Sequence, residues 1–233
     1  MEEQFKDPAK IEELKKLMCI PADATKPDIE ERFKRIAEIL KNDCVIQYES
    51  KEYRIIDFEF YFYNKNHQDI TVHPRKSEAM CWYINDFGGI DLNFESNIEP
   101  EIVPKGKTWS LKYKLTDKSF FGGILIRQIQ EINGEKRVLD GPLKVAELFR
   151  VLDATSKSQN NPILTIPTTP LNKIEFENKE RHNLLGTKKE IKAKVIYNIN
   201  QWFSNSSDLD EVDLQEKLAK FAQNIEYRYI YCK

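Results

Sequence analysis

Acidic and aromatic residues alternate along residues 53–63, in the run Tyr-Arg-Ile-Ile-Asp-Phe-Glu-Phe-Tyr-Phe-Tyr. Successive side chains of an extended strand point to opposite faces, so the run separates into a polar and an apolar set. The polar set is Asp57, Glu59, Tyr61 and Tyr63. The apolar set is Ile56, Phe58, Phe60 and Phe62. A carboxylate among tyrosines suits an aromatic pocket, and the same alternation also fits a solvated strand face.

Helices and strands around this run must position it. Apolar residues recur at helical spacing in residues 11–18, before Pro21, and in residues 29–40, where a helix is expected to begin near Asp28. Patterns typical of strands occur at residues 44–48, 53–63, 80–84, 89–94, 109–115, 122–132 and 163–166. Further helices are expected from Pro142 for about three turns, over residues 188–203 and over residues 212–225. Clustered strands with helices toward the ends predict an α+β fold.

The composition is that of a folded chain with no metal site. Of 233 residues, 40% are hydrophobic and 11% aromatic, which is enough for a packed core. Four cysteines form no CxxC motif and have no histidines close by, which predicts a reduced, intracellular chain without zinc. Residues 1–16 are too charged for a signal peptide, and no run of about 18 apolar residues could span a membrane. We expect a cytoplasmic protein with no metal, no cofactor and no membrane partner.

The total charge argues against a nucleic-acid partner, whereas its distribution along the chain does not. The 36 Lys and Arg residues and 38 Asp and Glu residues give a formal net charge of −2. Residues 1–100 carry a net −7, residues 101–200 a net +7 and residues 201–233 a net −2. Five lysines of the basic middle are candidates to contact phosphates: Lys105, Lys107, Lys112, Lys114 and Lys144. A row of lysines is also typical of a plain solvated surface.

Several stretches of the chain follow one another in the order found in a known family. Residues 33–40, 45–46 and 54–61 match a helix, a strand and a second strand that reads roughly I-V-E-T-E-A-Y. Residues 69–73 match a D-x-x-x-H segment, and residues 87–94 match a Y-G segment with its following strand. Residues 122–127 and 140–145 match A-V-L-I-R-A and S-G-P-G-K-L. Over residues 30–195 the chain therefore resembles the alkyladenine (3-methyladenine) DNA glycosylase family.

The resemblance implies a site for base excision. Glu59 would be the general base, and Arg127 would lie near the catalytic water. Four residues would contact the extruded base: Tyr61, His73, Tyr83 and Asn93. Phe87 would replace the tyrosine that wedges into the DNA gap. The chemistry requires a carboxylate within reach of a water, and an aromatic pocket to compensate for taking the base out of the stack.

The resemblance also implies the architecture and the substrate. Residues 28–200 would form a single α+β domain with a curved, mostly antiparallel mixed sheet or partial barrel flanked by helices. Residues 1–25 and 196–233 have no counterpart in the family. From their own helical patterns we expect residues 1–27 to be an N-terminal helical extension and residues 201–233 a C-terminal helical tail packed on the domain. The implied function is a monofunctional glycosylase that excises alkylated or deaminated purines from damaged double-stranded DNA.

Other functions stay open because one family segment is missing. The family's T-P-R-N segment is absent, and only Pro74-Arg75-Lys76-Ser77 occupies this contracted region. A non-catalytic member would keep the fold and the pocket as a nucleic-acid or nucleotide-binding module. A further alternative is an interaction domain that binds a protein through its acidic terminal helices. In these cases Arg127 would pair with a core carboxylate, His73 would cap a turn, and the tyrosines would be ordinary sheet residues.

Overall fold

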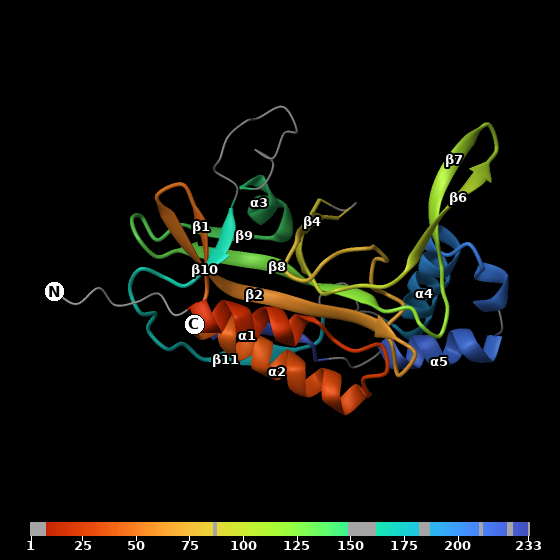
Figure 1. Ribbon diagram of the computed structural model, residues 1–233, viewed down its shortest axis with the longest axis horizontal. Coiled ribbons are helices and arrows are strands. Elements are labelled where there is room, and N and C mark those ends of the chain that lie inside the picture. Colours follow the sequence, from red (N-terminus) through yellow and green to blue (C-terminus); the bar gives the residue numbers. More distant parts are fainter. Residues whose placement is uncertain are drawn as a thin grey trace.

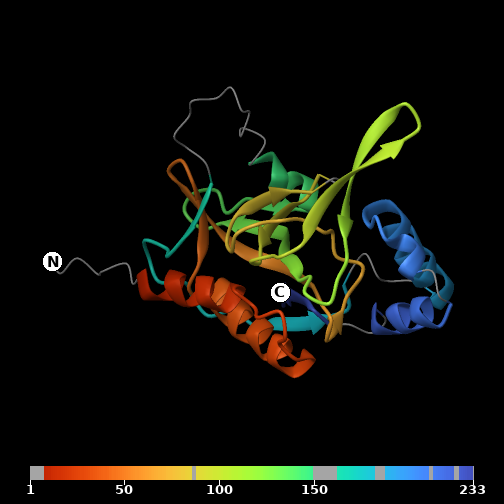
Figure 2. The same ribbon diagram turned by 45° about the vertical axis from the view of Figure 1, so that its right-hand side comes forward.

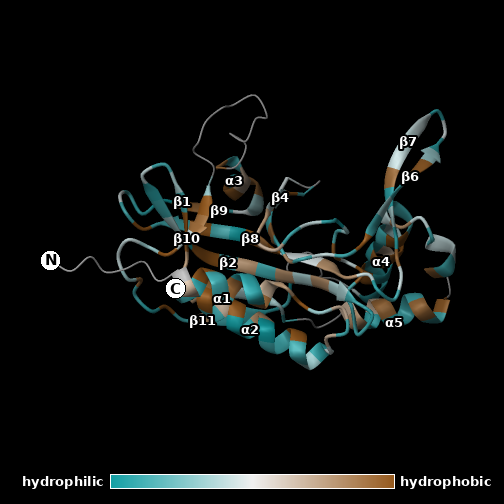
Figure 3. Ribbon diagram, in the orientation of Figure 1, coloured by the Kyte–Doolittle hydropathy of each residue, from teal (hydrophilic) through white to brown (hydrophobic). Residues whose placement is uncertain are grey.

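Two N-terminal helices, α1 (Pro8–Met18) and α2 (Lys26–Asn42), lie side by side against the sheet (Figure 1). The computed structural model describes residues 8–85, 88–148, 162–181, 187–209, 212–222 and 226–232. α2 begins close to the predicted position because Thr25 and Asp28 form a reciprocal capping box and Pro27 lies in the first turn. Brown and teal stripes along both helices mark an apolar side and a polar side (Figure 3).

A ten-stranded sheet forms the centre of the molecule, and its main strands follow the order β10–β1–β2–β8–β5–β4. Their bounds are Ile163–Thr165 for β10, Val45–Tyr48 for β1, Lys51–Asn64 for β2, Phe121–Glu131 for β8, Ile90–Asn93 for β5 and Trp82–Ile84 for β4. Four short strands pair at its margins: β3 (His67–Gln68), β9 (Val138–Asp140), β11 (Phe176–Lys179) and β12 (Arg228–Tyr231). All these strand pairs are antiparallel, and β2 and β8 curve across the molecule (Figure 1). The predicted α+β domain with a curved antiparallel sheet is confirmed.

Strand β2 has an apolar face toward α2 and a polar face away from it. Phe58, Phe60 and Phe62 are fully buried in the main core, and Phe60 stacks on Phe33 of α2 with ring centroids 4.4 Å apart. Ile55, rather than Ile56, joins this core because the pairing with β8 shifts register on both sides of Asp57. Such an irregularity re-aims the side chains beside it, which simple alternation does not predict.

The middle of the chain contains a helix and a hairpin. Helix α3 (Pro142–Glu147) begins at the predicted proline. The last part of its predicted three turns, from residue 149 to about residue 152, lies outside the described residues. Strand β7 (Thr108–Lys114) was predicted, and it pairs with β6 (Glu99–Lys105), which was not. This hairpin projects from the body of the molecule (Figures 1 and 2).

The two ends of the chain are integral parts of the domain. Leu14 and Met18 of α1 are fully buried in the same core as the phenylalanines of β2. Helices α4 (Lys188–Trp202) and α5 (Val212–Ala222) pack on each other, and a 3₁₀ turn η2 (Ser206–Leu209) lies between them. The predicted C-terminal tail is helical only in part, because its last residues form β12 beside β2. Among the described residues, no helix has both the length and the apolarity to cross a membrane.

Candidate functional site

Two carboxylates of β2 and two arginines form a buried cluster on the polar face of the sheet. Asp57 accepts hydrogen bonds from Nε and Nη2 of Arg228, on β12, over 2.9 and 2.6 Å. Glu59 is fully buried; its Oε2 lies 3.4 Å from Arg127 Nη1, and its Oε1 lies 3.7 Å from Arg228 Nε. Burial raises the pKa of Asp57 although both arginines oppose this, and the hydrogen bond to Asp57 raises the pKa of Arg228. The predicted contact between Glu59 and Arg127 is thus present. A second arginine, Arg228, lies beside the other oxygen of Glu59.

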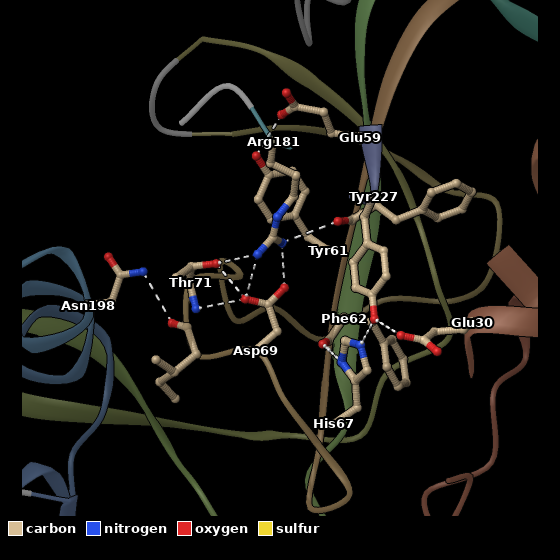
Figure 4. Close-up of polar contacts among 12 residues, drawn as sticks. Glu30, Glu59, Tyr61, Phe62, His67, Asp69, Thr71, Arg181, Asn198 and Tyr227 are labelled. Atoms are coloured by element: carbon tan, nitrogen blue, oxygen red, sulfur yellow. Dashed lines mark hydrogen bonds and ion pairs between the residues drawn. The ribbon is translucent and has the colours of Figure 1, made fainter. Parts of the chain in front are cut away.

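Tyr61 connects this cluster to a cavity. Its hydroxyl donates a hydrogen bond to Glu59 Oε2 over 2.7 Å, which two side chains on the same strand face can form. The Arg181 guanidinium lies over the tyrosine ring, 4.4 Å from its centroid (Figure 4). Burial raises the pKa of Tyr61 well above its ordinary value, and the Glu59 carboxylate raises it further. The hydroxyl therefore stays protonated and remains a donor to Glu59.

Arg181 is fixed by a second buried ion pair, with Asp69 (Figure 4). Its two terminal nitrogens donate to the two Asp69 oxygens over 2.5 and 3.2 Å, and Nη1 also donates to the Phe60 carbonyl over 3.2 Å. Burial raises the pKa of the Asp69 carboxyl, but the attraction of Arg181 outweighs it and leaves that pKa below its ordinary value. The pair thereby holds the guanidinium against the ring of Tyr61.

A cavity of about 90 Å³ lies beside Tyr61 on this polar face. Its walls are formed by Tyr61, Thr71, Val72, His73, Arg75, Asn85, Asp91, Leu125, Asn198 and Trp202. The rings of His73 and Trp202 meet edge to face with centroids 4.0 Å apart, and the Tyr83 ring lies 6.1 Å from His73. Aromatic rings and polar groups are typical of small-molecule sites, but ligand pockets usually measure about 300–1,000 Å³, so a purine would enter only if the walls move apart.

Arg75 organises one wall of the cavity. Its Nη2 lies 2.9 Å from Asp91 Oδ2, and its Nε donates to Asn93 Oδ1 over 2.6 Å. The same guanidinium lies 4.7 Å from the centroid of the Tyr83 ring. Burial raises the pKa of Asp91, and Arg75 acts in the opposite direction. Tyr83 and Asn93 therefore contact Arg75, and Arg75 and Asp91 form the cavity wall beside them.

The predicted site residues are brought together only in part, because Tyr61 and His73 line the cavity and four others do not: Glu59, Arg127, Tyr83 and Asn93. Glu59, Tyr61 and Arg127 form one cluster, and His73 lines the cavity that Tyr61 reaches. Phe87, the predicted DNA wedge, lies outside the described residues.

The predicted phosphate-contact lysines divide between two places. Lys105, Lys107, Lys112 and Lys114 belong to the β6–β7 hairpin, whereas Lys144 is exposed on α3. Lys112 is engaged by α4, because its Nζ donates to the carbonyl oxygens of Asn200 and Phe203 over 2.9 and 3.5 Å. A cation at the C-terminal end of a helix also interacts favourably with the helix dipole. The other four lysine side chains are exposed.

Several residues of the site were not predicted from the sequence. They are Arg228, Asp91 and Trp202, together with the roles of Arg75 and Arg181. Two signals in the sequence could have found some of them. Residues 228–231 alternate between two side-chain types, as a short strand does, and Asp91 lies two residues before Asn93 and so shares its strand face. No spacing in the sequence signals a pair such as Asp69–Arg181, because 112 residues separate its members.

A further buried network ties the turn after β2 to α2 and to the C-terminal segment (Figure 4). His67 is fully buried, and its Nδ1–H donates to the Phe62 carbonyl over 2.7 Å. Its Nε2 lies 3.0 Å from the Tyr227 hydroxyl, which donates to Glu30 over 2.8 Å. Burial lowers the pKa of His67 to about 4. His67 is therefore neutral near pH 7 and serves the fold rather than the cavity.

The charges of the polar face balance one another. Each of its four carboxylates has an arginine partner: Asp57 with Arg228, Glu59 with Arg127, Asp69 with Arg181 and Asp91 with Arg75. Within the described ranges, no group of three or more His, Cys, Asp and Glu side chains could hold a metal ion.

The fold and the site together define an α+β protein with an arginine-paired carboxylate cluster beside a small aromatic cavity. The chain is 25% identical, over 218 residues, to an uncharacterized protein, L759, of Acanthamoeba polyphaga mimivirus, with 88% of each chain covered. No family model matches the chain. No solved structure matches it either.

Proposed function

We propose that this protein is a monofunctional DNA glycosylase-like hydrolase that removes alkylated or deaminated purines from damaged double-stranded DNA. The observation that carries the proposal is the contact of Glu59 with both Arg127 and Tyr61, because Tyr61 also lines a cavity with His73 and Trp202 in its wall. A carboxylate held by an arginine suits a general base, and an aromatic cavity suits a base taken out of the stack.

The reaction assigns one step to each part of the site. A water oxygen attacks the sugar carbon that carries the damaged base, and the water proton passes to Glu59. The bond between sugar and base breaks, and the base leaves with the electron pair of that bond. A cationic alkylated purine leaves as the neutral base, whereas hypoxanthine leaves as an anion that takes up a proton from solvent water. Arg127 orients the carboxylate, Tyr61 and His73 offer ring faces to the base, and Asp91 offers an acceptor to its N–H groups. We also propose a cytoplasmic location, because all four cysteines are free, as is usual in a reducing compartment.

A second candidate function is a non-catalytic nucleic-acid or nucleotide-binding module. It is favoured by the complete burial of Glu59, whose Oε2 accepts from Tyr61 and Arg127 while Arg228 lies beside Oε1. A general base must reach a water in the substrate complex. In a binding module the same carboxylate would only hold Tyr61 and the arginines in place.

The test is release of a base from a DNA duplex that carries a single hypoxanthine or 3-methyladenine. We expect release by the wild-type protein and a loss of at least about 100-fold in Glu59→Gln, because a positioned acid or base contributes that much or more. Glu131→Gln is the matched control, because Glu131 is equally buried but pairs with Lys51, away from the cavity. Thermal unfolding of each variant establishes that it folds.

Two outcomes separate the candidate functions. If the wild type and Glu59→Gln both bind the duplex and neither releases a base, the binding module is the correct function. Equal release by the wild type and Glu59→Gln would instead remove Glu59 from the mechanism.

A further inference from the structure

The β6–β7 hairpin exposes three large apolar side chains. Ile102 is 72% exposed, Trp109 71% and Leu111 52%. Ile102 pairs with Leu111 and Pro104 pairs with Trp109, so these side chains share one face of the hairpin. Hairpin residues line a pocket together with Asn200 and Gln201 at the end of α4; they are Val103, Pro104, Lys105, Ser110 and Lys112. Near the base of the hairpin the same face carries Tyr113, which is buried in a cluster with residues of α4, so the exposed part of the apolar face is its outer part.

The hairpin is basic toward its tip. Residues 102–114 include four lysines and no acidic residue, whereas Glu99 and Glu101 at the base lie opposite Lys114 and Lys112. Lys105 and Lys107 flank Gly106 at the turn, where the backbone adopts φ = 60°. Lys112 anchors the hairpin to α4 through the Asn200 carbonyl, which leaves the other three lysines exposed. A projecting arm with an apolar face and a cationic tip requires a partner that is both polyanionic and able to accept apolar contacts.

Other partners fit these features less well. Pro100 and Pro104 lack the N–H groups that an added strand would need, so pairing along the β6 edge is disfavoured. A second copy of the chain would oppose lysines with lysines. Insertion of the tip into a membrane is disfavoured because Lys105 and Lys107, which are strongly hydrated, would enter first. A protein partner is disfavoured because protein interfaces are depleted in lysine.

We propose that the β6–β7 hairpin binds a groove of duplex DNA, with Ile102, Trp109 and Leu111 toward the base edges and the tip lysines toward phosphates. A two-stranded β-ribbon fits the major groove, where apolar side chains contact thymine methyl groups. Lysine contacts to phosphates fix the position of the protein on the duplex.

The position of the hairpin relates it to the cavity. Tyr113 near its base forms a bridge with Phe203, and the preceding residue, Trp202, lines the cavity. DNA held by the hairpin would therefore run close to the site. The inference rests on the proposed function in one respect: it identifies how the DNA substrate of that site is held.

The test measures binding of a short fluorescein-labelled DNA duplex by anisotropy over a series of salt concentrations. We expect Trp109→Ser to weaken binding about tenfold, as for a buried tryptophan anchor. We expect the double variant Lys105→Gln/Lys107→Gln to lower the slope of log affinity against log salt by about 1.8, or 0.9 for each lost phosphate contact. Lys15→Gln/Lys16→Gln on α1 is the matched control, because both lysines are exposed away from the hairpin, and it should leave the slope unchanged.

Parallel measurements with a single-stranded oligonucleotide and with vesicles of anionic phospholipid decide the partner. Preferential binding of either one over the duplex would overturn the proposal, as would unchanged duplex binding in the hairpin variants. If no base is released but binding still depends on the hairpin, the hydrolase proposal fails and the hairpin proposal stands.

Discussion

The two faces of β2 are built from the same strand but are stabilised by different forces. On one face, Phe58 and Phe60 pack into a core of hydrophobic side chains with α2. On the other face, Asp57 and Glu59 are equally buried but are surrounded by arginines from β8 and β12. Alternating side chains, with a single irregularity at Asp57, separate the two environments.

The difference predicts how each face responds to substitution. An apolar core loses stability gradually, according to the volume removed and how far its neighbours can relax. A buried ion pair responds abruptly, because removal of one member leaves the other charged and without its partner. Such pairs contribute little net stability, so four of them on one polar face are more readily explained by a requirement to hold polar groups in fixed positions.

The largest expected effect is on the pair that supports Tyr61. Arg181→Leu should lower the free energy of unfolding by about 3–5 kcal/mol, because it leaves the Asp69 carboxylate buried and unpaired. Urea unfolding at pH 7 measures the change. A loss below about 1 kcal/mol would contradict this expectation. It would mean that Asp69 finds another partner or becomes solvated when Arg181 is removed.

A double variant isolates the ion pair from the packing around it. Arg181→Leu/Asp69→Leu should be more stable than Arg181→Leu alone, because no unpaired charge remains. The double variant should nevertheless lose the support of the Tyr61 ring. Its DNA binding and base release should therefore remain impaired even though its stability partly recovers.

The sequence predicted the elements of this comparison better than their contacts. The capping residues of α2 and the alternation in β2 are local signals, and both elements formed as predicted. The position of Arg228 beside Asp57 depends on β12 pairing with a strand that lies about 170 residues earlier, and no local pattern encodes that choice. Strand β6 was not predicted because it contains two prolines, which usually argue against a strand. Proline is tolerated there because β6 is an edge strand.

The second prediction concerns His67, which lies between the apolar face and the C-terminal segment. Its pKa is about 4 in the folded protein and about 6.5 in an unfolded chain, so the unfolded state binds more protons between these values. The contribution of neutral His67 is complete above about pH 6.5 and is lost progressively as the pH falls toward 4. The full loss corresponds to about 3 kcal/mol.

The measurement is urea unfolding of the wild type and of His67→Gln from pH 7 to pH 4. Glutamine can donate to the Phe62 carbonyl but does not titrate, so the difference between the two proteins isolates the histidine. We expect the wild type to lose about 3 kcal/mol more than the variant over this range. Parallel pH profiles would show that His67 is not buried in its neutral form.

The smallest expected effect comes from the apolar face and completes the comparison. Ile124 of β8 pairs with Phe60 and is fully buried, whereas its neighbour Leu125 lines the cavity on the opposite face. Ile124→Val removes one methyl group and should lower the free energy of unfolding by about 0.5–1.5 kcal/mol. DNA affinity and base release should stay at wild-type levels, because no group around the cavity changes. If Ile124→Val impairs either function as strongly as Arg181→Leu does, the two faces are mechanically coupled through the sheet, and the polar face does not hold its geometry by ion pairs alone.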